Sequence, residues 1–242
     1  MIKTVIFDLD DTLYSYVKAN NKAFSLLQKF VEKNFGWSPE EFKEMHDDMF
    51  QEHLRTMGPI AAAHNRLIRF QAILDRMEKP SHYALEMHDL YWNALIEAAE
   101  LYDKVPEVLK ELKEAGLKIG IGTNMTSLIQ YKKLAKFNVL HLFDFIVTSE
   151  EAGIDKPDSK FFNFCLKKAK CKPQECLFVG DSEAHDIKGA LGANMKALQL
   201  YEDNENIKIS NLCPQTTWGT FIEDLKKLSI FDQNPQDSAI HA

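Results

Sequence analysis

Asp8 and Asp10 are the residues of this sequence whose type and spacing best suit chemistry. They end an apolar run that begins at Val5, and a single residue separates them. Because side chains alternate along a strand, both carboxylates start on one face at the carboxyl end of a predicted buried parallel strand. Ligands of open α/β sheets bind at that edge. One aspartate there can attack an electrophile while the other transfers protons and a cation balances the charge.

Two later segments supply groups that stabilise a transferring phosphoryl group. Thr123 and Asn124 close a second apolar run, and their hydroxyl and amide can donate hydrogen bonds to an oxyanion. Lys156 follows a third run, and its ammonium can neutralise phosphate charge. Each signal is weak alone, but the order of the three residues along the chain fits one site.

A fourth apolar run leads into Gly180, and the segment from there to Asp186 carries further carboxylates. Asp181 stands at the predicted strand end, and Asp186 lies one helical turn later. Four aspartates at one sheet edge would repel one another unless a hard cation lay among them. Mg²⁺ prefers such oxygen ligands, so the sequence predicts a magnesium site.

The apolar pattern predicts the elements that must position these residues. Runs with parallel-strand character lie at residues 4–8, 118–123, 145–148, 177–180 and 196–200. Helical periodicity at 107–115, 127–137, 159–169 and 184–192 flanks and separates the last four runs. This alternation is typical of a doubly wound α/β fold with a parallel sheet.

About a hundred residues with almost no glycine lie between the first two runs, far more than a single crossover needs. Helices are expected there at 16–35, 39–53, 59–77 and 81–98, the last one capped by Ser81. The sequence therefore predicts a helical cap domain over residues 16–98, inserted into a core formed by residues 1–15 and 99–230. A last helix is expected at 218–228, and residues 231–242 are expected to be a flexible tail.

Composition narrows the class of protein. The 242 residues carry a formal net charge of −7 without a dense basic cluster, which disfavours a nucleic-acid partner. No apolar stretch approaches the ~18 residues of a spanning helix, so we expect no membrane partner and a cytoplasmic monomer or homodimer. The four cysteines show no C-x-x-C pair, and reduced thiols are expected rather than zinc ligands or disulfides.

Together these motifs resemble those of the haloacid dehalogenase superfamily, in its branch with a helical cap after the first strand. The similarity covers about residues 3–200. The motif D-x-D-x-[TV] reads from Asp8 to Thr12, the second motif is Thr123 and the third is Lys156. The fourth, G-D-[ST]-x-x-x-D, runs from Gly180 to Asp186.

The resemblance implies a fold and a reaction. The fold is α/β, with a Rossmann-like parallel sheet core in three layers and an inserted helical cap. In the reaction Asp8 attacks phosphorus and becomes an aspartyl phosphate, while Asp10 protonates the leaving oxygen and then activates water. The name-giving dehalogenases lack an aspartate at the position of Asp10, so its presence favours phosphate over halide chemistry.

The resemblance also implies the ligand sets. Mg²⁺ would be held by the Asp8 carboxylate, the Asp10 main-chain carbonyl and Asp181, with Asp186 acting through water or by orienting these ligands. The transferring phosphoryl group would be bound by Thr123, Asn124 and Lys156. The expected activity is a Mg²⁺-dependent phosphatase acting on a small phosphorylated metabolite, a nucleoside monophosphate or a sugar phosphate.

Two alternatives to a phosphatase remain open at this point. A phosphomutase would use the same nucleophile and keep the phosphoryl group from water. A non-catalytic regulatory protein would only bind the phosphorylated metabolite.

The predicted cap helices contain two groups of polar residues. The densest basic cluster, which selects substrate or else pairs with acids at the surface, is His64, Asn65, Arg66 and Arg69. His46 and His53 are seven residues apart on one side of a predicted helix, where we expect a solvated face.

Overall fold

The structure, a computed structural model, describes residues 1–202 and 211–228. Its strands are β1 (Thr4–Phe7), β2 (Lys118–Thr123), β3 (Phe145–Thr148), β4 (Cys176–Gly180), β5 (Lys196–Tyr201) and β6 (Gln215–Thr217). In the described residues they form one parallel sheet in the order β3-β2-β1-β4-β5-β6. The five predicted strands are confirmed to within one residue at each end. The short edge strand β6 was missed because its residues, Gln-Thr-Thr, form no apolar run.

The strand order reverses between β1 and β4. From β1 the chain moves outward through β2 and β3 on one side, and through β4, β5 and β6 on the other. Phe7 of β1 pairs with Ile121 of β2 and Val179 of β4, and the backbone N–H of Asp8 donates to Val179 O at 2.8 Å. The carboxyl ends of β1 and β4 therefore form the switch point at which such sheets bind ligands.

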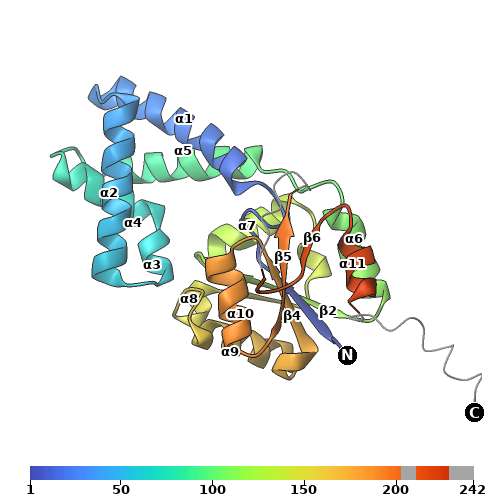
Figure 1. Cartoon of the computed structure of the whole chain (residues 1–242). Helices are drawn as coiled ribbons and strands as arrows, with labels where there is room; N and C mark the ends of the chain where they lie inside the picture. The colour runs from blue at the N-terminus through green and yellow to red at the C-terminus, as the bar shows by residue number, and fades with distance from the viewer. Residues whose placement is uncertain (203–210, 229–242) are drawn as a thin grey trace, which may run out of the picture.

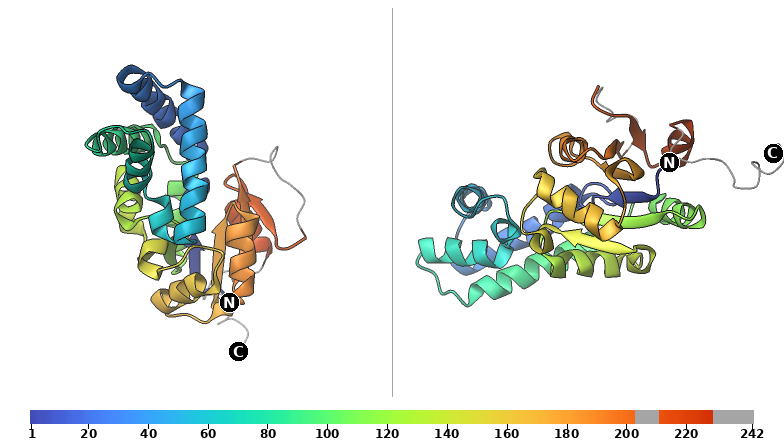
Figure 2. Two further views of the ribbon diagram at one scale, coloured as in Figure 1. Left: turned by 90° about the vertical axis from the view of Figure 1, so that its left-hand side faces the viewer. Right: turned by 90° about the horizontal axis from the view of Figure 1, so that it is seen from below.

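Both faces of the sheet are buried by helices (Figures 1 and 2). Alternation in β1 sends Val5 and Phe7 into one apolar cluster and Ile6 into another. The first cluster includes residues of α6 (Val105–Glu114), α7 (Ser127–Lys136) and α11 (Phe221–Lys227), and the second includes residues of α9 (Ser159–Ala169) and α10 (Lys188–Gly192). The predicted α/β fold with a Rossmann-like parallel sheet in three layers is confirmed.

Short elements connect these layers. They are α8 (Ser149–Ala152), η1 (Leu140–Leu142), η2 (Pro173–Glu175) and η3 (Glu183–Ile187). The helix predicted at 184–192 is interrupted, because η3 is a single turn of π-helix before α10 begins. Isolated π turns of this kind are frequent at functional sites.

A helical lobe follows β1 and stands beside the sheet (Figure 1). It consists of α1 (Tyr16–Phe35), α2 (Pro39–Met57), α3 (Ala61–His64), α4 (Arg66–Arg76) and α5 (Tyr83–Ala98). Helix α1 packs against α5, and α2 packs against α4. Ser38 and Glu41 form a capping box that fixes the start of α2.

Three predictions for this lobe were wrong in detail. The helix expected at 59–77 breaks at Asn65, whose side chain accepts the N–H of Leu67 at 2.9 Å and so begins α4. Ser81 does not cap α5; the capping position is His82, which makes no capping side-chain hydrogen bond. The helix predicted at 39–53 continues to Met57.

The cysteine prediction was wrong for one pair. The turn between α9 and β4 brings the Cα atoms of Cys171 and Cys176 to 6.7 Å, and the two residues form a disulfide. Cys165 and Cys213 are free thiols, and burial raises the pKa of Cys165 to about 12. The predicted tail at 231–242 lies outside the described residues. No helix in the described part of the chain is long and apolar enough to cross a membrane.

Candidate active site

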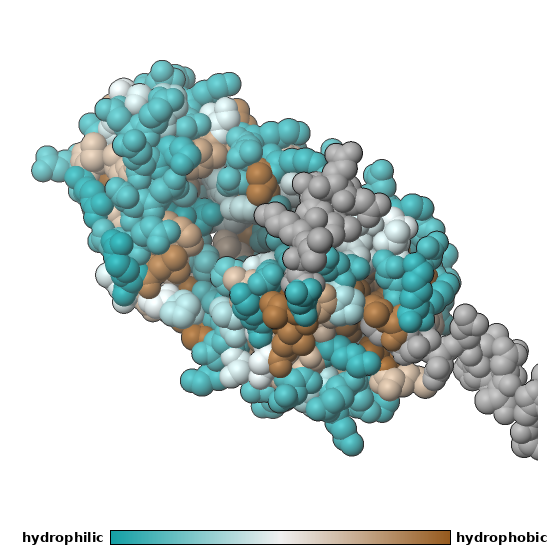
Figure 3. Space-filling view, viewed as in Figure 1, coloured by the Kyte–Doolittle hydropathy of each residue, from teal (hydrophilic) through white to brown (hydrophobic). Residues whose placement is uncertain are grey.

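A cavity of about 260 Å³ opens at the switch point of the sheet. Figure 3 shows a hollow between the helical lobe and the sheet. All the predicted site residues line the cavity, namely Asp8, Asp10, Thr123, Asn124, Lys156, Asp181 and Asp186. Residues far apart in the sequence therefore meet at one sheet edge, as the strand-end pattern predicts.

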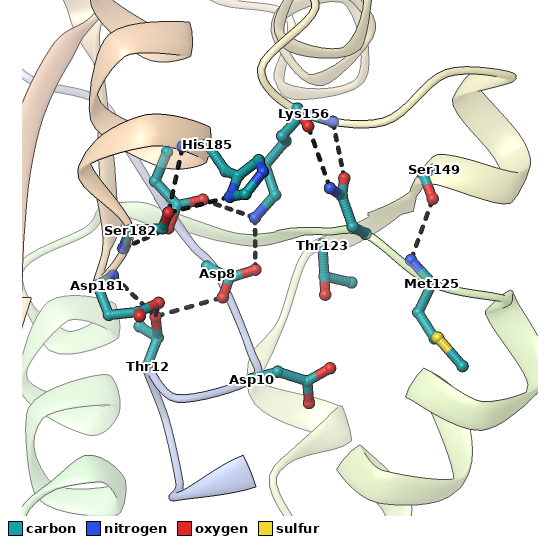
Figure 4. Close-up of polar contacts among 12 residues, drawn as sticks. Asp8, Asp10, Thr12, Thr123, Met125, Ser149, Lys156, Asp181, Ser182 and His185 are labelled. Atoms are coloured by element: carbon teal, nitrogen blue, oxygen red, sulfur yellow. Dashed lines mark hydrogen bonds and ion pairs between the residues drawn. The ribbon is translucent and has the colours of Figure 1, made fainter. Parts of the chain in front are cut away.

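Asp8 is fixed at the end of β1 and its side chain faces cationic and acidic neighbours (Figure 4). The Lys156 ammonium lies 2.5 Å from Oδ1 of Asp8, and the Thr12 hydroxyl lies 3.3 Å from Oδ2. Burial raises the pKa of Asp8, and the nearby Asp186 and Asp181 raise it further, although Lys156 opposes them. An additional cation would favour the ionised form that a nucleophile needs.

Lys156 is held in place from both its backbone and its side chain. Its buried ammonium bridges Asp8 and Asp186, the second at 2.6 Å. The side chain of Asn124 accepts the Lys156 backbone N–H at 2.7 Å and donates to the Lys156 carbonyl oxygen at 3.2 Å. Both ends of the Asn124 amide are thus engaged with the backbone of Lys156, so Asn124 positions the lysine.

Asp181 and Asp186 are positioned by the end of β4 and by the π turn. The Asp181 backbone N–H donates to the Thr12 hydroxyl at 3.2 Å, and the Ser182 N–H donates to Asp186 Oδ2 at 3.1 Å. A Cβ atom at Gly180 would collide with the Asp186 carboxylate, so the glycine permits this close approach. Thr12 therefore links the strand ends that carry Asp8 and Asp181.

The carboxylates of Asp8, Asp181 and Asp186 make a set that fits a hard cation. One oxygen from each lies within 4.8 Å of the other two. Burial raises the pKa of Asp181 to about 7, and repulsion from Asp186 and Asp11 adds to this effect. Crowded oxygen ligands whose charge is poorly balanced suit Mg²⁺ rather than a soft metal. The part predicted for the Asp10 main-chain carbonyl stays a prediction.

The Asp10 carboxylate is engaged by residues that the motif reading missed. Lys133 Nζ lies 2.7 Å from Asp10 Oδ1, the Tyr14 hydroxyl donates to the same oxygen at 2.6 Å, and Gln130 Nε2 donates to Oδ2 at 3.2 Å. Burial alone would raise the pKa of Asp10, but the Lys133 charge and these hydrogen bonds outweigh it and lower the pKa. Gln130 also donates to the Thr123 hydroxyl at 2.7 Å, which joins two predicted site residues.

A sequence signal for this contact exists. Gln130 and Lys133 are both buried, as are their neighbours Ile129 and Leu134 on α7. Polar residues at the apolar positions of an amphipathic helix need buried partners, so they are candidates for a site.

In the helical lobe, the expectations of a solvated histidine face and a surface arginine were wrong. His46 and His53 are buried, and Arg69 is 1% exposed. The packing of α2 against α4 covers these side chains, and the Arg69 guanidinium lies over the Phe50 ring at 4.2 Å. His46 Nε2 lies 3.2 Å from a terminal guanidinium nitrogen of Arg69.

The fold and the cavity together define a class of protein, in which a Rossmann-like sheet carries acidic groups and a lysine at its switch point and a helical insertion follows the first strand. The family model of haloacid dehalogenase-like hydrolases matches residues 5–200. The chain therefore belongs to this family.

Known proteins similar to this chain agree with that assignment. The chain is 34% identical over 209 residues to ribulose-1,5-bisphosphate 5-phosphatase of Halopiger xanaduensis, covering 85% of this chain and 87% of the relative. It is 28% identical over 231 residues to glyceraldehyde 3-phosphate phosphatase of Methanothermobacter thermautotrophicus, covering 94% and 98%. Among solved structures, the magnesium-bound HAD-hydrolase YfnB of Bacillus subtilis has a TM-score of 0.71 at 25% identity, covering 95% of this chain and 99% of that chain.

Proposed function

We propose that the protein is a Mg²⁺-dependent phosphatase that hydrolyses a small phosphorylated metabolite through an aspartyl phosphate on Asp8. The observation that carries this proposal is the environment of Asp8, whose carboxylate lies between the Lys156 ammonium and the metal-compatible group formed with Asp181 and Asp186. The similarity to phosphatases of ribulose 1,5-bisphosphate and glyceraldehyde 3-phosphate favours a sugar phosphate as substrate over a nucleoside monophosphate.

The reaction proceeds in two steps that use the two aspartates in different roles. In the first, an Asp8 oxygen bonds to phosphorus and the bond from phosphorus to the leaving oxygen breaks. Asp10, which must take up a proton before the attack because its pKa is low, gives that proton to the leaving oxygen. In the second, Asp10 takes a proton from water, the water oxygen bonds to phosphorus, and the bond between Asp8 and phosphorus breaks. Asp8 and Asp10 return to their starting states, and phosphate is released.

The remaining residues bind the ion and the phosphoryl group. The ion would be held by the Asp8 and Asp181 carboxylates and the Asp10 main-chain carbonyl, oriented by Asp186, and when bound it balances the negative charge at phosphorus. Lys156 binds the phosphoryl group. The Thr123 oxygen already accepts a hydrogen bond from Gln130, which leaves its O–H to donate to the phosphoryl group.

The helical lobe, residues 16–98, acts in this proposal as a cap on a core formed by residues 1–15 and 99–230. Two contacts join them beside the site. His64 Nε2 lies 2.9 Å from Asp155 Oδ2, and the Asp155 backbone N–H donates to Pro59 O at 2.9 Å. A cap so close to Lys156 limits the substrate to a small molecule and excludes water during attack.

Phosphate release from a panel of phosphorylated metabolites, with Mg²⁺ or EDTA, tests the proposal. Release should require Mg²⁺ and fall by at least about 10³-fold in Asp8→Asn, and by about 10²-fold or more in Asp10→Asn. Asp11→Asn is the matched control, because Asp11 has a φ of 58° that asparagine tolerates, its carboxylate accepts the Val17 N–H, and the proposed reaction gives it no role. Asp11→Asn should stay within a few-fold of the native rate.

Three results would count against the phosphatase. Native rates in Asp8→Asn, or release that is indifferent to EDTA, would remove the nucleophile or the metal from the mechanism. An isomeric phosphate formed without free phosphate would instead indicate a phosphomutase.

A further inference from the structure

The helical lobe contains two largely covered guanidinium groups for which the described residues supply no acidic partner. Among the described residues, neither Arg66 nor Arg69 forms an ion pair with a carboxylate. Arg69 is almost fully buried, and Arg66 is only partly exposed. Burying a cation without a counter-charge is unfavourable. Two covered arginines that lack a carboxylate partner therefore indicate a functional role.

Arg66 retains donors for a further partner. Its guanidinium donates to the His64 carbonyl oxygen at 3.1 Å and to the Tyr16 hydroxyl at 3.0 Å. A guanidinium has five N–H donors, and these two bonds leave one N–H on each terminal nitrogen of Arg66, whereas its Nε is buried. The two hydrogen bonds fix the planar group, while its charge and remaining donors stay available.

Two aromatic residues connect Arg66 to the side of the site on which Asp10 lies. Its guanidinium carbon lies 5.9 Å from the Trp92 ring centroid, and Lys133 Nζ lies 5.5 Å from the same ring. Lys133 also lies 5.5 Å from the ring of Tyr16, which accepts a hydrogen bond from Arg66. Because Lys133 contacts Asp10, which protonates the leaving oxygen in the proposed reaction, Arg66 lies across two aromatic residues from that proton donor.

Arg66 differs from the two lysines that contact the site aspartates, because each of those lysines has a carboxylate partner. Lys133 is neutralised by Asp10, and Lys156 is neutralised by Asp8 and Asp186. Arg66 lies in the helical lobe without such a partner among the described residues. A substrate with two anionic groups would be repelled by the aspartates of the core, and a cation on the leaving-group side offsets that repulsion.

The residues behind Arg66 keep this region positive. Burial and the charges of Arg66 and Arg69 lower the pKa of His46 to about 3, so this histidine stays neutral. Arg69, at 1% exposure, does not reach a ligand, but its charge adds to the potential at Arg66. Asp47 contacts His46 at 3.2 Å and pairs with Lys43 at 2.7 Å.

We propose that Arg66 binds a second anionic group, a carboxylate or a phosphate, on the leaving group of the substrate. This inference rests on the proposed phosphatase activity and names its substrate class: phosphate esters whose alcohol portion carries its own negative charge. Arg66 determines specificity and takes no part in the chemical steps. A bidentate contact of the guanidinium with two anionic oxygens fits both groups.

Three esters separate the possibilities. Glycerol 3-phosphate has a neutral leaving group, 3-phosphoglycerate carries a carboxylate, and ribulose 1,5-bisphosphate carries a second phosphate. We expect the native enzyme to have a higher kcat/KM for one or both charged esters. In Arg66→Gln that kcat/KM should fall about 10- to 100-fold, mostly through KM, while the value for glycerol 3-phosphate changes less than about threefold. The ester with the larger loss identifies the anion.

Two further variants control for structure. Arg66→Lys keeps the positive charge but lacks the planar pair of N–H donors, so it should recover part of the loss in kcat/KM. Arg76→Gln removes an arginine from the same helix, where it pairs with Glu52 at the surface, and should leave all three esters unchanged. An equal loss for all three esters in Arg66→Gln and Arg66→Lys would overturn the inference, because it would make Arg66 a structural tie. Native activity without preference for a charged ester would overturn it as well.

The failure of the proposed function would look different. If native protein with Mg²⁺ released no phosphate from these esters or from p-nitrophenyl phosphate, the phosphatase proposal would fall and the inference with it. Hydrolysis that is insensitive to the charge of the leaving group would remove the inference alone.

Discussion

The ammonium of Lys133 lies 2.7 Å from Asp10 Oδ1, and the Lys133 side chain has no solvent exposure. Lysine is rarely buried without a paired acid, because its charge is costly to remove from water. Here the rings of Tyr14, Tyr16 and Trp92 surround the ammonium at 5.5 to 5.7 Å, and Asp10 supplies the counter-charge. Helix α7 thus holds the carboxylate to which the proposed reaction assigns proton transfer.

Replacing Lys133 tests whether this contact positions Asp10. In Lys133→Met the carboxylate loses its counter-charge and its main orienting donor, so kcat should fall about 10- to 100-fold with KM for the phosphate ester within about threefold. Lys132→Met is the control, since Lys132 is exposed on the same helix. Steady-state kinetics with the best ester of the panel make the measurement, and equal kcat values in the two variants would contradict the positioning role.

Asp181 should make the metal-free protein less stable as the pH rises. Burial raises its pKa to about 7, above the ~3.9 of an unfolded aspartate, so between these values the folded protein binds more protons than the unfolded chain. The free energy of unfolding therefore decreases from pH 4 to pH 7. In EDTA at pH 8, Asp181→Asn should be more stable than native protein by on the order of 1–3 kcal/mol.

Denaturant unfolding in EDTA at pH 8 and at pH 4 measures this difference. The advantage of Asp181→Asn should be fully present above pH 7 and lost by pH 4. Added Mg²⁺ should stabilise the native protein and have little effect on the variant, because binding to the folded state alone raises stability. A variant that is less stable than native protein in EDTA at pH 8 would show that Asp181 is not destabilising when no cation is bound.

The parts of this fold that the sequence could predict depend on short-range patterns. Apolar runs locate β1 to β5, and residues directly after such runs must meet at the sheet edge, as Asp8, Thr123 and Asp181 do. The edge strand β6 has no apolar run, and the break at Asn65 depends on a side chain that caps instead of continuing a helix. The local sequence pattern therefore predicts neither the edge strand nor the helix break.

Buried charge was the main feature that the sequence could not predict. Lys133 falls among the apolar positions of its helix, but this placement does not identify its partner. Arg69 looks like a surface residue, because charged side chains are almost always exposed unless they are paired. Their partners, Asp10 and His46, lie 123 and 23 positions away. Similarly, the engagement of the Asn124 amide with the Lys156 backbone requires two strand ends to meet. The motifs were sufficient to propose the chemistry. The residues that orient the catalytic side chains could be identified only in the structure.

Asn124 should act through Lys156. In Asn124→Ala the Lys156 backbone loses a hydrogen-bond acceptor at 2.7 Å and a donor at 3.2 Å, so the ammonium that faces Asp8 is less well fixed. We expect kcat/KM to fall about 10-fold or more and stability to fall by about 1–3 kcal/mol. Asn124→Asp keeps the acceptor and should recover part of the stability. Unchanged kinetics in Asn124→Ala would show that Lys156 is held without this side chain.

The contact of His64 with Asp155 should hold the helical lobe against the sheet. Asp155 is 3% exposed and precedes Lys156, so its hydrogen bond to His64 at 2.9 Å joins the lobe directly to the site. In His64→Ala this bond is lost while the Asp155 N–H still donates to Pro59 O, and the lobe should open more often. His88→Ala is a matched control, because His88 also lies 2.9 Å from an aspartate, Asp89, but within the lobe. Small-angle X-ray scattering should show a larger radius of gyration for His64→Ala than for native protein or His88→Ala, and KM should rise. Identical scattering from all three proteins would mean that the remaining contacts, such as the packing of α5 against α7, set the position of the lobe without this bond.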